Sequence, residues 1–352
     1  MMHTPHTSPV PLASSPQRLR LHIGVLVLGT LALAFLALCV GADGVKLPRE
    51  AWAEDGLLRH IVVDIRAPRM LGAWLVGALL GLAGGIAQGL FRNPLAEPYL
   101  LGSASGASLF VALFMLLAAW TTHSQNHLDL GWLLRLGMTG AAFLGAGVSV
   151  LLTMVLAGGA RRNLQLLLAG VVVGVVMGAA TALIMLMNPS IMPNMQSFMW
   201  GNTAFIGWPS AVLLCAAFFP CVLLATLGAR GLNALALGEL TASSLGLPLA
   251  RFRLLYIVLI ALATGAAVAQ AGLIAFIGLA APHIARGQIS GNYRLLLPFA
   301  ACYGGLLLLL ADVVARLVIL PEELPVGIIT ALVGGAYLLV LMHRRNLQGE
   351  GS

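Results

Sequence analysis

The chain has 352 residues, of which 60% are hydrophobic and only 9% are charged, and its formal net charge is +7. Because a typical soluble protein is about 25% charged, this composition excludes a water-soluble globular protein. Only one of the 19 basic residues is a lysine, Lys46, so the chain lacks the lysine motif of a nucleotide-binding P-loop. The arginines stand singly or in pairs between apolar runs, which argues against nucleic-acid binding and for cationic cytoplasmic loops of a membrane protein.

The N-terminal region begins with a polar stretch rich in Pro, Ser and Thr, which predicts a disordered cytoplasmic tail at residues 1–20. An apolar run follows at 21–42, directly after Arg18 and Arg20. It is longer than most signal-peptide hydrophobic regions, so we interpret it as a retained first span. The alternative is a signal peptide cleaved after Ala42.

Nine further apolar segments predict about ten membrane-spanning helices in a permease domain that covers residues 21–345. They occupy residues 67–90, 99–120, 133–156, 164–187, 210–227, 253–271, 272–286, 295–319 and 326–341. The segment 272–286 is too short for a straight crossing, and its Gly, Pro and Arg286 predict a bent or partial helix. If it did not cross, nine spans would leave the C-terminal arginines outside, against the positive-inside rule. Ten spans place both termini in the cytoplasm.

Three stretches have unusual composition. Glycines recur along 67–90, which predicts a tightly packed central helix, since small residues let helices approach closely in lipid. The uncharged segment 188–209 is rich in Pro, Asn, Met and Trp, and irregular backbone of this kind must lie at the outer surface or line a protein cavity. Residues 231–250 are rich in small residues and predict short helices at the cytoplasmic surface.

The potential metal ligands are few. The cysteines lie in apolar runs without C-x-x-C spacing, and we interpret them as small buried hydrophobic residues. They are Cys39, Cys215, Cys221 and Cys302. His123 and His127 are four residues apart in a polar outer loop without an obvious third ligand, so a solvated loop is favoured over a metal or haem site. We expect His283 to be structural, and no metal site is predicted.

Three phrases carry a family resemblance. They are Arg66-Ala67-Pro68-Arg69 followed by Arg92-Asn93-Pro94-Leu95-Ala96-Glu97-Pro98; Gly278-Leu279 with Pro282-His283; and Ala311-Asp312 with Ala315-Arg316 and Glu323-Leu324-Pro325-Val326-Gly327. In this order they resemble the FecCD-type permeases of ATP-driven importers for iron-siderophores, haem and cobalamin, over about residues 60–342. Asn292-Tyr293-Arg294 stands where the family often has Asp-His-Arg, which leaves the substrate branch open.

The resemblance implies an all-α type II ABC importer permease fold in the bacterial inner membrane. The family's permeases form a homodimer in lipid on two cytoplasmic ATP-binding-cassette ATPases and receive cargo from a periplasmic substrate-binding protein. This subunit would be no enzyme and bind no cofactor, because ATP and Mg belong to the ATPase. We expect an iron chelate, siderophore or haem, as cargo, with cobalamin as the alternative.

Two other classes of membrane protein fit the sequence less well. An ion-coupled secondary transporter would need buried titratable residues along its pathway, and only Asp312 is a candidate. An intramembrane enzyme has less support, because no His/Glu/Asp or Ser/His constellation lies at one depth.

The resemblance also implies roles for individual residues. Binding-protein docking is expected at Arg66, Arg69 and Arg316, with local ion pairs to Asp312 or Asp64 as the alternative. Coupling to the ATPase, within cytoplasmic coupling helices at 231–250, is expected at Glu239, Ser243, Ser244 and Gly246. A cytoplasmic gate is expected at Asn93, Leu95, Asn163, Leu164 and Gln165. The pathway lining is expected at Met185, Met192, Met195, Met199 and Trp200, with core packing equally open for these side chains.

Overall fold

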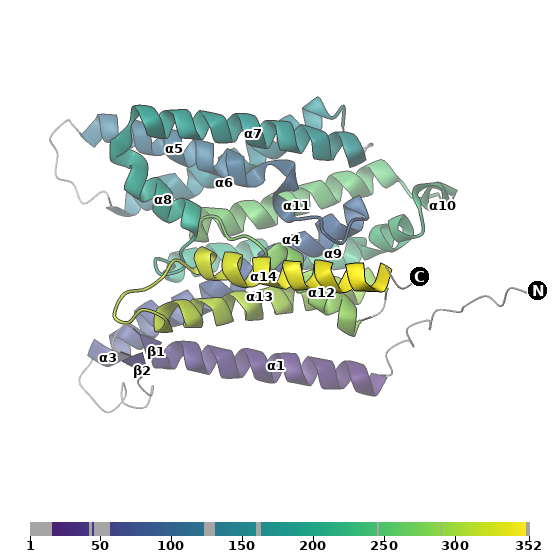
Figure 1. Ribbon diagram of the computed structural model, residues 1–352, viewed down its shortest axis with the longest axis horizontal. Coiled ribbons are helices and arrows are strands. Elements are labelled where there is room, and N and C mark those ends of the chain that lie inside the picture. The colour runs from purple at the N-terminus through teal and green to yellow at the C-terminus, as the bar shows by residue number, and fades with distance from the viewer. Residues whose placement is uncertain are drawn as a thin grey trace, which may run out of the picture.

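The computed structural model describes residues 16–41, 44–45, 57–122, 131–159, 163–244, 246–289 and 291–349. The described chain is a bundle of helices that run roughly along one long axis (Figure 1). Its only strands in these ranges, β1 (Val40–Gly41) and β2 (Gly44–Val45), form one antiparallel pair. The all-α prediction is therefore confirmed. The expectations for residues 1–15 and for His123 and His127 lie outside the described residues.

The described helices follow one another along the chain in the order of their labels. They are α1 (Pro16–Cys39), α3 (Leu57–His60), the π-helical turn η1 (Ile61–Arg66), α4 (Ala67–Phe91), η2 (Pro98–Leu101), α5 (Ser103–Thr122), α6 (Gly131–Leu156), α7 (Asn163–Met187), η3 (Pro189–Ile191), α8 (Met192–Trp200), α9 (Trp208–Ala236), α10 (Glu239–Ser244), α11 (Leu249–Ala271), α12 (Ile277–Gln288), α13 (Tyr293–Leu317) and α14 (Val326–Gly349). We call the end of the bundle that carries α3 and the strand pair the α3 end, and the opposite end the α10 end (Figure 1).

The sequence predicts about ten spans, and each predicted segment contains a helix. In the described part of the chain, seven helical segments are long and apolar enough to cross a membrane, and two shorter apolar segments lie at Ser103–Ala119 and Val326–Val340. The tenth predicted segment contains α12, which has twelve residues and therefore rises by about 18 Å, too little for a full crossing. The expectation of a partial helix there is correct.

Three expected boundaries need correction. α1 already begins at Pro16, so residues 16–20 are helical and do not belong to a disordered tail. α9 continues to Ala236, beyond the expected end at 227, and α11 begins at Leu249. Among the described residues of 231–250, the six-residue α10 is the one separate helix. The segment 188–209 also contains η3 and α8, so it is more regular than its composition indicated.

Helix α4 forms the centre of the bundle, as its glycines predicted. Nearly all of its side chains are buried, and it packs against α13, α11, α9 and α12. At Gly77 and Gly84 the backbone of α4 lies so close to Gly304 and Gly278 that a β-carbon would overlap their carbonyl oxygens. In lipid there is no hydrophobic driving force between helices, so the close backbone contact that glycines allow stabilises the packing instead.

The chain between α11 and α12 is unwound, and other segments of the bundle satisfy its backbone. The Leu273 N–H donates to the Phe198 carbonyl at 3.0 Å, and the Tyr99 hydroxyl donates to the Ile274 carbonyl at 3.2 Å. The Phe276 N–H donates to Glu97 Oε1 at 3.3 Å. These bonds are needed because no water is available to an irregular backbone surrounded by apolar helices.

Candidate functional site

A buried network of charged side chains joins several segments at the α3 end. Arg69 donates to Asp312 Oδ1 through Nε at 3.1 Å and Nη2 at 3.0 Å, and its Nη1 donates to Glu323 Oε2 at 2.7 Å. Arg316 and the Thr203 hydroxyl also donate to the Asp312 carboxylate. Asp312 is fully buried, and it is paired and hydrogen-bonded as a buried charge must be.

Two arginines of this end also hold the end of α1. Arg66 Nη1 donates to the carbonyl oxygens of Leu38 at 2.9 Å and Cys39 at 3.1 Å. Arg316 Nη1 donates to those of Ala37 at 3.0 Å and Val40 at 3.2 Å. The last carbonyl groups of a helix have no partner within the helix, and cationic side chains are favourable there.

The three predicted docking arginines lie together at one end of the bundle, but they are less exposed than a docking role requires. Arg66, Arg69 and Arg316 all lie at the α3 end, but they are only 8%, 7% and 1% exposed, and their guanidinium groups contact the same chain. The alternative of a local Arg316–Asp312 pair is confirmed. The alternative ion pair between Arg66 and Asp64 is not observed, since Asp64 pairs with His60.

The predicted coupling residues lie on the exposed surface of α10 and just after it. Glu239 forms an ion pair with Arg253. The Ser243 and Ser244 hydroxyls donate to carbonyl groups within α10, and Gly246 is exposed beyond it. Sequence reasoning missed two leucines here: Leu237 is 68% exposed and Leu240 is 87% exposed. The signal that could have identified them is the presence of large apolar side chains in the short stretch between two long helices.

The predicted gate residues come together at the α10 end. Asn163, the first residue of α7, donates from Nδ2 to the Leu90 carbonyl of α4 at 3.0 Å. The Leu95 N–H donates to Asn93 Oδ1 at 2.9 Å, which closes a local turn after α4. Leu95 and Leu164 are exposed, and Gln165 is exposed next to Leu164. Two leucines and the neighbouring Gln165 are therefore exposed at this end of the bundle.

The predicted pathway residues separate into two groups. Met195 is fully buried in a core with Ala107 and Val111, and Met185 packs against the same core. Core packing, the alternative for these side chains, is therefore correct for Met195. Met192, Met199 and Trp200 are exposed on α8. These three remain available to line a pathway.

The described residues contain no group of three or more His, Cys, Asp or Glu side chains that could hold a metal ion. All four cysteines are free and at least half-buried, as the sequence indicated. His283 makes an edge contact with Tyr337, with ring centroids 5.9 Å apart, which fits the structural role expected for it.

Comparison with known proteins gives a consistent result. The chain is 36% identical over 339 residues to HmuU of Yersinia pestis, a hemin transport system permease protein, covering 94% of this chain and 98% of HmuU. It is 38% identical over 316 residues to BtuC of Salmonella typhimurium, a vitamin B12 import system permease protein, covering 89% and 91% of the two chains.

A solved structure described as an inward-facing conformation of a metal-chelate type ABC transporter matches with a TM-score of 0.81 and 27% identity. The match covers 92% of this chain and 99% of that chain. The model of the FecCD transport family matches residues 29–344, which is nearly the whole sequence. The chain belongs to the FecCD transport family.

Proposed function

We propose that this protein is the transmembrane permease subunit of an ABC importer that carries an iron chelate, haem or an iron-siderophore complex, from the periplasm to the cytoplasm. The observation that carries this proposal is the 36% identity to the hemin permease HmuU over 94% of the chain. The similarity to a metal-chelate type transporter supports the same cargo class.

The proposed partners are a second copy of the chain, two cytoplasmic ATPase subunits and a periplasmic substrate-binding protein. The exposed leucines at α10 support the ATPase contact, because Leu237 and Leu240 would expose a costly apolar surface to water if nothing covered them. The partner ATPase would hydrolyse ATP, so this chain would bind neither ATP nor Mg and would form the path for the cargo.

We place the α10 end, and with it both termini, in the cytoplasm. Exposed or half-buried arginines at this end include Arg20, Arg92, Arg230, Arg251, Arg286 and Arg294. The described acids there, Glu97 and Glu239, are already bonded to Phe276 and Arg253. Excess basic residues on one side support a cytoplasmic location in the inner membrane.

Docking of the binding protein at the α3 end stays a prediction, and it requires an exchange of partners. Arg69 holds Asp312 deep in the bundle and Glu323 at its rim, where the Glu323 side chain is 27% exposed. A carboxylate of the binding protein can replace Glu323 without disturbing the Arg69–Asp312 pair. Arg66 and Arg316 would then stabilise the docking surface by holding the end of α1 in place.

We propose the gate and the pathway from the exposure of the side chains that the family resemblance assigns to them. Asn93, Leu95, Asn163, Leu164 and Gln165 would form the gate with the same residues of the second copy. Met192, Met199 and Trp200 would line the pathway, because methionine and tryptophan offer a soft apolar surface for a large cargo. Met195 does not belong to this proposed lining, because it is fully buried.

The test is uptake by proteoliposomes that contain the permease, its ATPase and its binding protein. Haem, an iron-siderophore and cobalamin are offered in parallel, with and without ATP. We expect ATP-dependent uptake of an iron chelate. Uptake of cobalamin alone would support the second candidate, which the identity to BtuC favours. Uptake driven by a proton gradient without ATP would contradict the importer proposal.

A further inference from the structure

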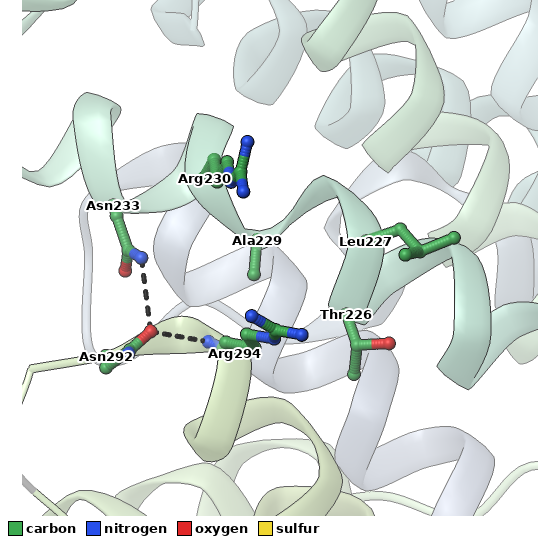
Figure 2. A pocket seen from close by; sticks show the side chains of 7 residues that line it. All are labelled: Thr226, Leu227, Ala229, Arg230, Asn233, Asn292 and Arg294. Atoms are coloured by element: carbon green, nitrogen blue, oxygen red, sulfur yellow. Dashed lines mark hydrogen bonds between the residues drawn. The ribbon is translucent and has the colours of Figure 1, made fainter.

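A cavity of about 440 Å³ lies at the α10 end, between the last turns of α9 and the start of α13. Its lining includes Arg230 and Asn233 from α9 and Asn292 and Arg294 from the start of α13. Figure 2 shows the two arginine side chains on either side of Ala229 in this view. Both arginines are exposed, so their guanidinium groups are open to a ligand.

The polar floor of the cavity is held in place by hydrogen bonds between the two helices. Asn233 Nδ2 donates to Asn292 Oδ1 at 3.2 Å, and the Arg294 N–H donates to the same oxygen at 3.0 Å (Figure 2). The Tyr293 N–H donates to Asn233 Oδ1 at 2.9 Å. These bonds fix α9 and α13 relative to each other, so the two arginine backbones are held at a set spacing before any ligand arrives.

The charge of the cavity is not balanced within the described part of the chain. Neither Arg230 nor Arg294 has an acidic partner among the described residues. Two guanidinium groups that share one cavity favour an anion, and a phosphate offers each of them a bidentate partner. The lining residues therefore suit an anion such as a phosphate group.

One wall of the cavity continues into an exposed apolar stripe on α9. Phe219, Leu223 and Leu227 are four residues apart on α9, so they lie on one face of the helix. They are 66%, 57% and 66% exposed, and Leu227 itself lines the cavity. A molecule with a phosphate in the cavity would have its apolar part beside this stripe.

We propose that this cavity binds the phosphate of an anionic phospholipid from the cytoplasmic leaflet, with the acyl chains along Phe219, Leu223 and Leu227. The proposal rests on the orientation given above, which puts the α10 end in the cytoplasm. Basic pockets between transmembrane helices on this side of a membrane suit anionic lipid headgroups. The lipid would brace α9 against α13 directly before α10, the helix proposed to contact the ATPase.

The experiment titrates the purified permease in detergent with phosphatidylglycerol and counts bound lipid by native mass spectrometry. Arg230→Gln with Arg294→Gln is expected to weaken binding by about 10- to 30-fold, since each basic residue near a membrane surface contributes appreciably to anionic lipid binding. The matched control is Arg251→Gln, another exposed arginine at the same end but outside the cavity. It should bind like the unchanged protein. The single variants should give intermediate affinities, and they keep the test decisive if the double variant does not fold.

Three further arms identify the occupant. Zwitterionic phosphatidylcholine should bind more weakly than phosphatidylglycerol, and inorganic phosphate should not displace the lipid at comparable concentrations. Displacement by inorganic phosphate would overturn the lipid proposal in favour of a free phosphate. Equal lipid binding by the double variant, or equal loss in Arg251→Gln, would also overturn it. A double variant that keeps its lipid but no longer assembles with the ATPase would assign the arginines to that protein instead. None of these readouts depends on the cargo, so they are independent of the uptake experiment.

Discussion

Arg69 and Asp312 are 243 residues apart in the sequence, yet the guanidinium and the carboxylate meet in the interior with Nη2 3.0 Å from Oδ1. The pair joins the first turn of α4 to the last turns of α13. Arg316 and Thr203 complete the bonding of the carboxylate. The α3 end is thus fixed by one acid that serves three donors from different segments.

Asp312→Asn should destabilise the permease by about 3 to 5 kcal/mol, because it takes the paired carboxylate away from the buried Arg316 and leaves Arg69 with Glu323 alone. Thermal unfolding of the solubilised protein measures the effect. Glu322→Gln is the control, since Glu322 is exposed in the loop between α13 and α14. Equal unfolding temperatures for Asp312→Asn and the unchanged protein would show that the network contributes little to stability.

Glu323→Gln should strengthen the affinity for the binding protein if Arg69 exchanges Glu323 for a carboxylate of that protein. The gain should be about threefold to fivefold, because a partly exposed ion pair contributes up to ~1 kcal/mol. Surface plasmon resonance with immobilised permease measures it, with Glu322→Gln as the control. Weaker binding by Glu323→Gln would mean that Glu323 itself contacts the binding protein.

Leu240→Ala should weaken assembly with the ATPase by about tenfold or more, since burying a leucine is worth roughly 1.5–3 kcal/mol. The unfolding temperature of the isolated permease should not change, because Leu240 is 87% exposed. Leu254→Ala, an exposed leucine on α11, is the control. Pull-down of the ATPase at graded concentrations checks the prediction. It fails if the two variants bind the ATPase equally well.

Gly84→Ala should destabilise the bundle by about 1 to 3 kcal/mol, because its β-carbon would press α4 away from Gly278 at the start of α12. Gly147→Ala in α6 makes the same change where no atom lies within 4 Å of the new β-carbon. It should be neutral or stabilising by up to about 1 kcal/mol, the helix propensity of alanine over glycine. Thermal unfolding compares the two variants, and equal losses would contradict the close-packing argument.

The spans could be predicted from the sequence because lipid demands long apolar helices, and each expected segment corresponds to a helix of the structure. The centre of the bundle was also predictable, since the glycines of α4 mark where backbones meet. Which side chains of the other helices face the core could not be predicted. A helix such as α7 is apolar on all sides, so its sequence does not distinguish lipid-facing from core-facing positions.

The candidate site was predictable in location and less so in detail. The family resemblance placed Arg66, Arg69 and Arg316 at one end, but only the fold reveals that the end of α1 covers two of them. Met195 and Met199 are four residues apart on α8, and the packing of α8 on α5 buries only the first. The sequence places Leu240 in the short stretch between two long helices, but a leucine in an apolar chain gives by itself no sign of whether it is buried or exposed.

The unwound segment between α11 and α12 also constrains how the protein is made. Twelve residues are too few for the insertion machinery to treat α12 as an independent span. The backbone just before α12 is bonded to Phe198, Tyr99 and Glu97, all of which are synthesised earlier. We therefore expect α12 to enter the bilayer late, together with α11 and α13, onto a partly assembled bundle. Ribosome-bound chains in which residue 288 is followed by an unrelated linker, long enough to bring α12 out of the exit tunnel, should leave this segment accessible to water-soluble thiol reagents at an introduced cysteine.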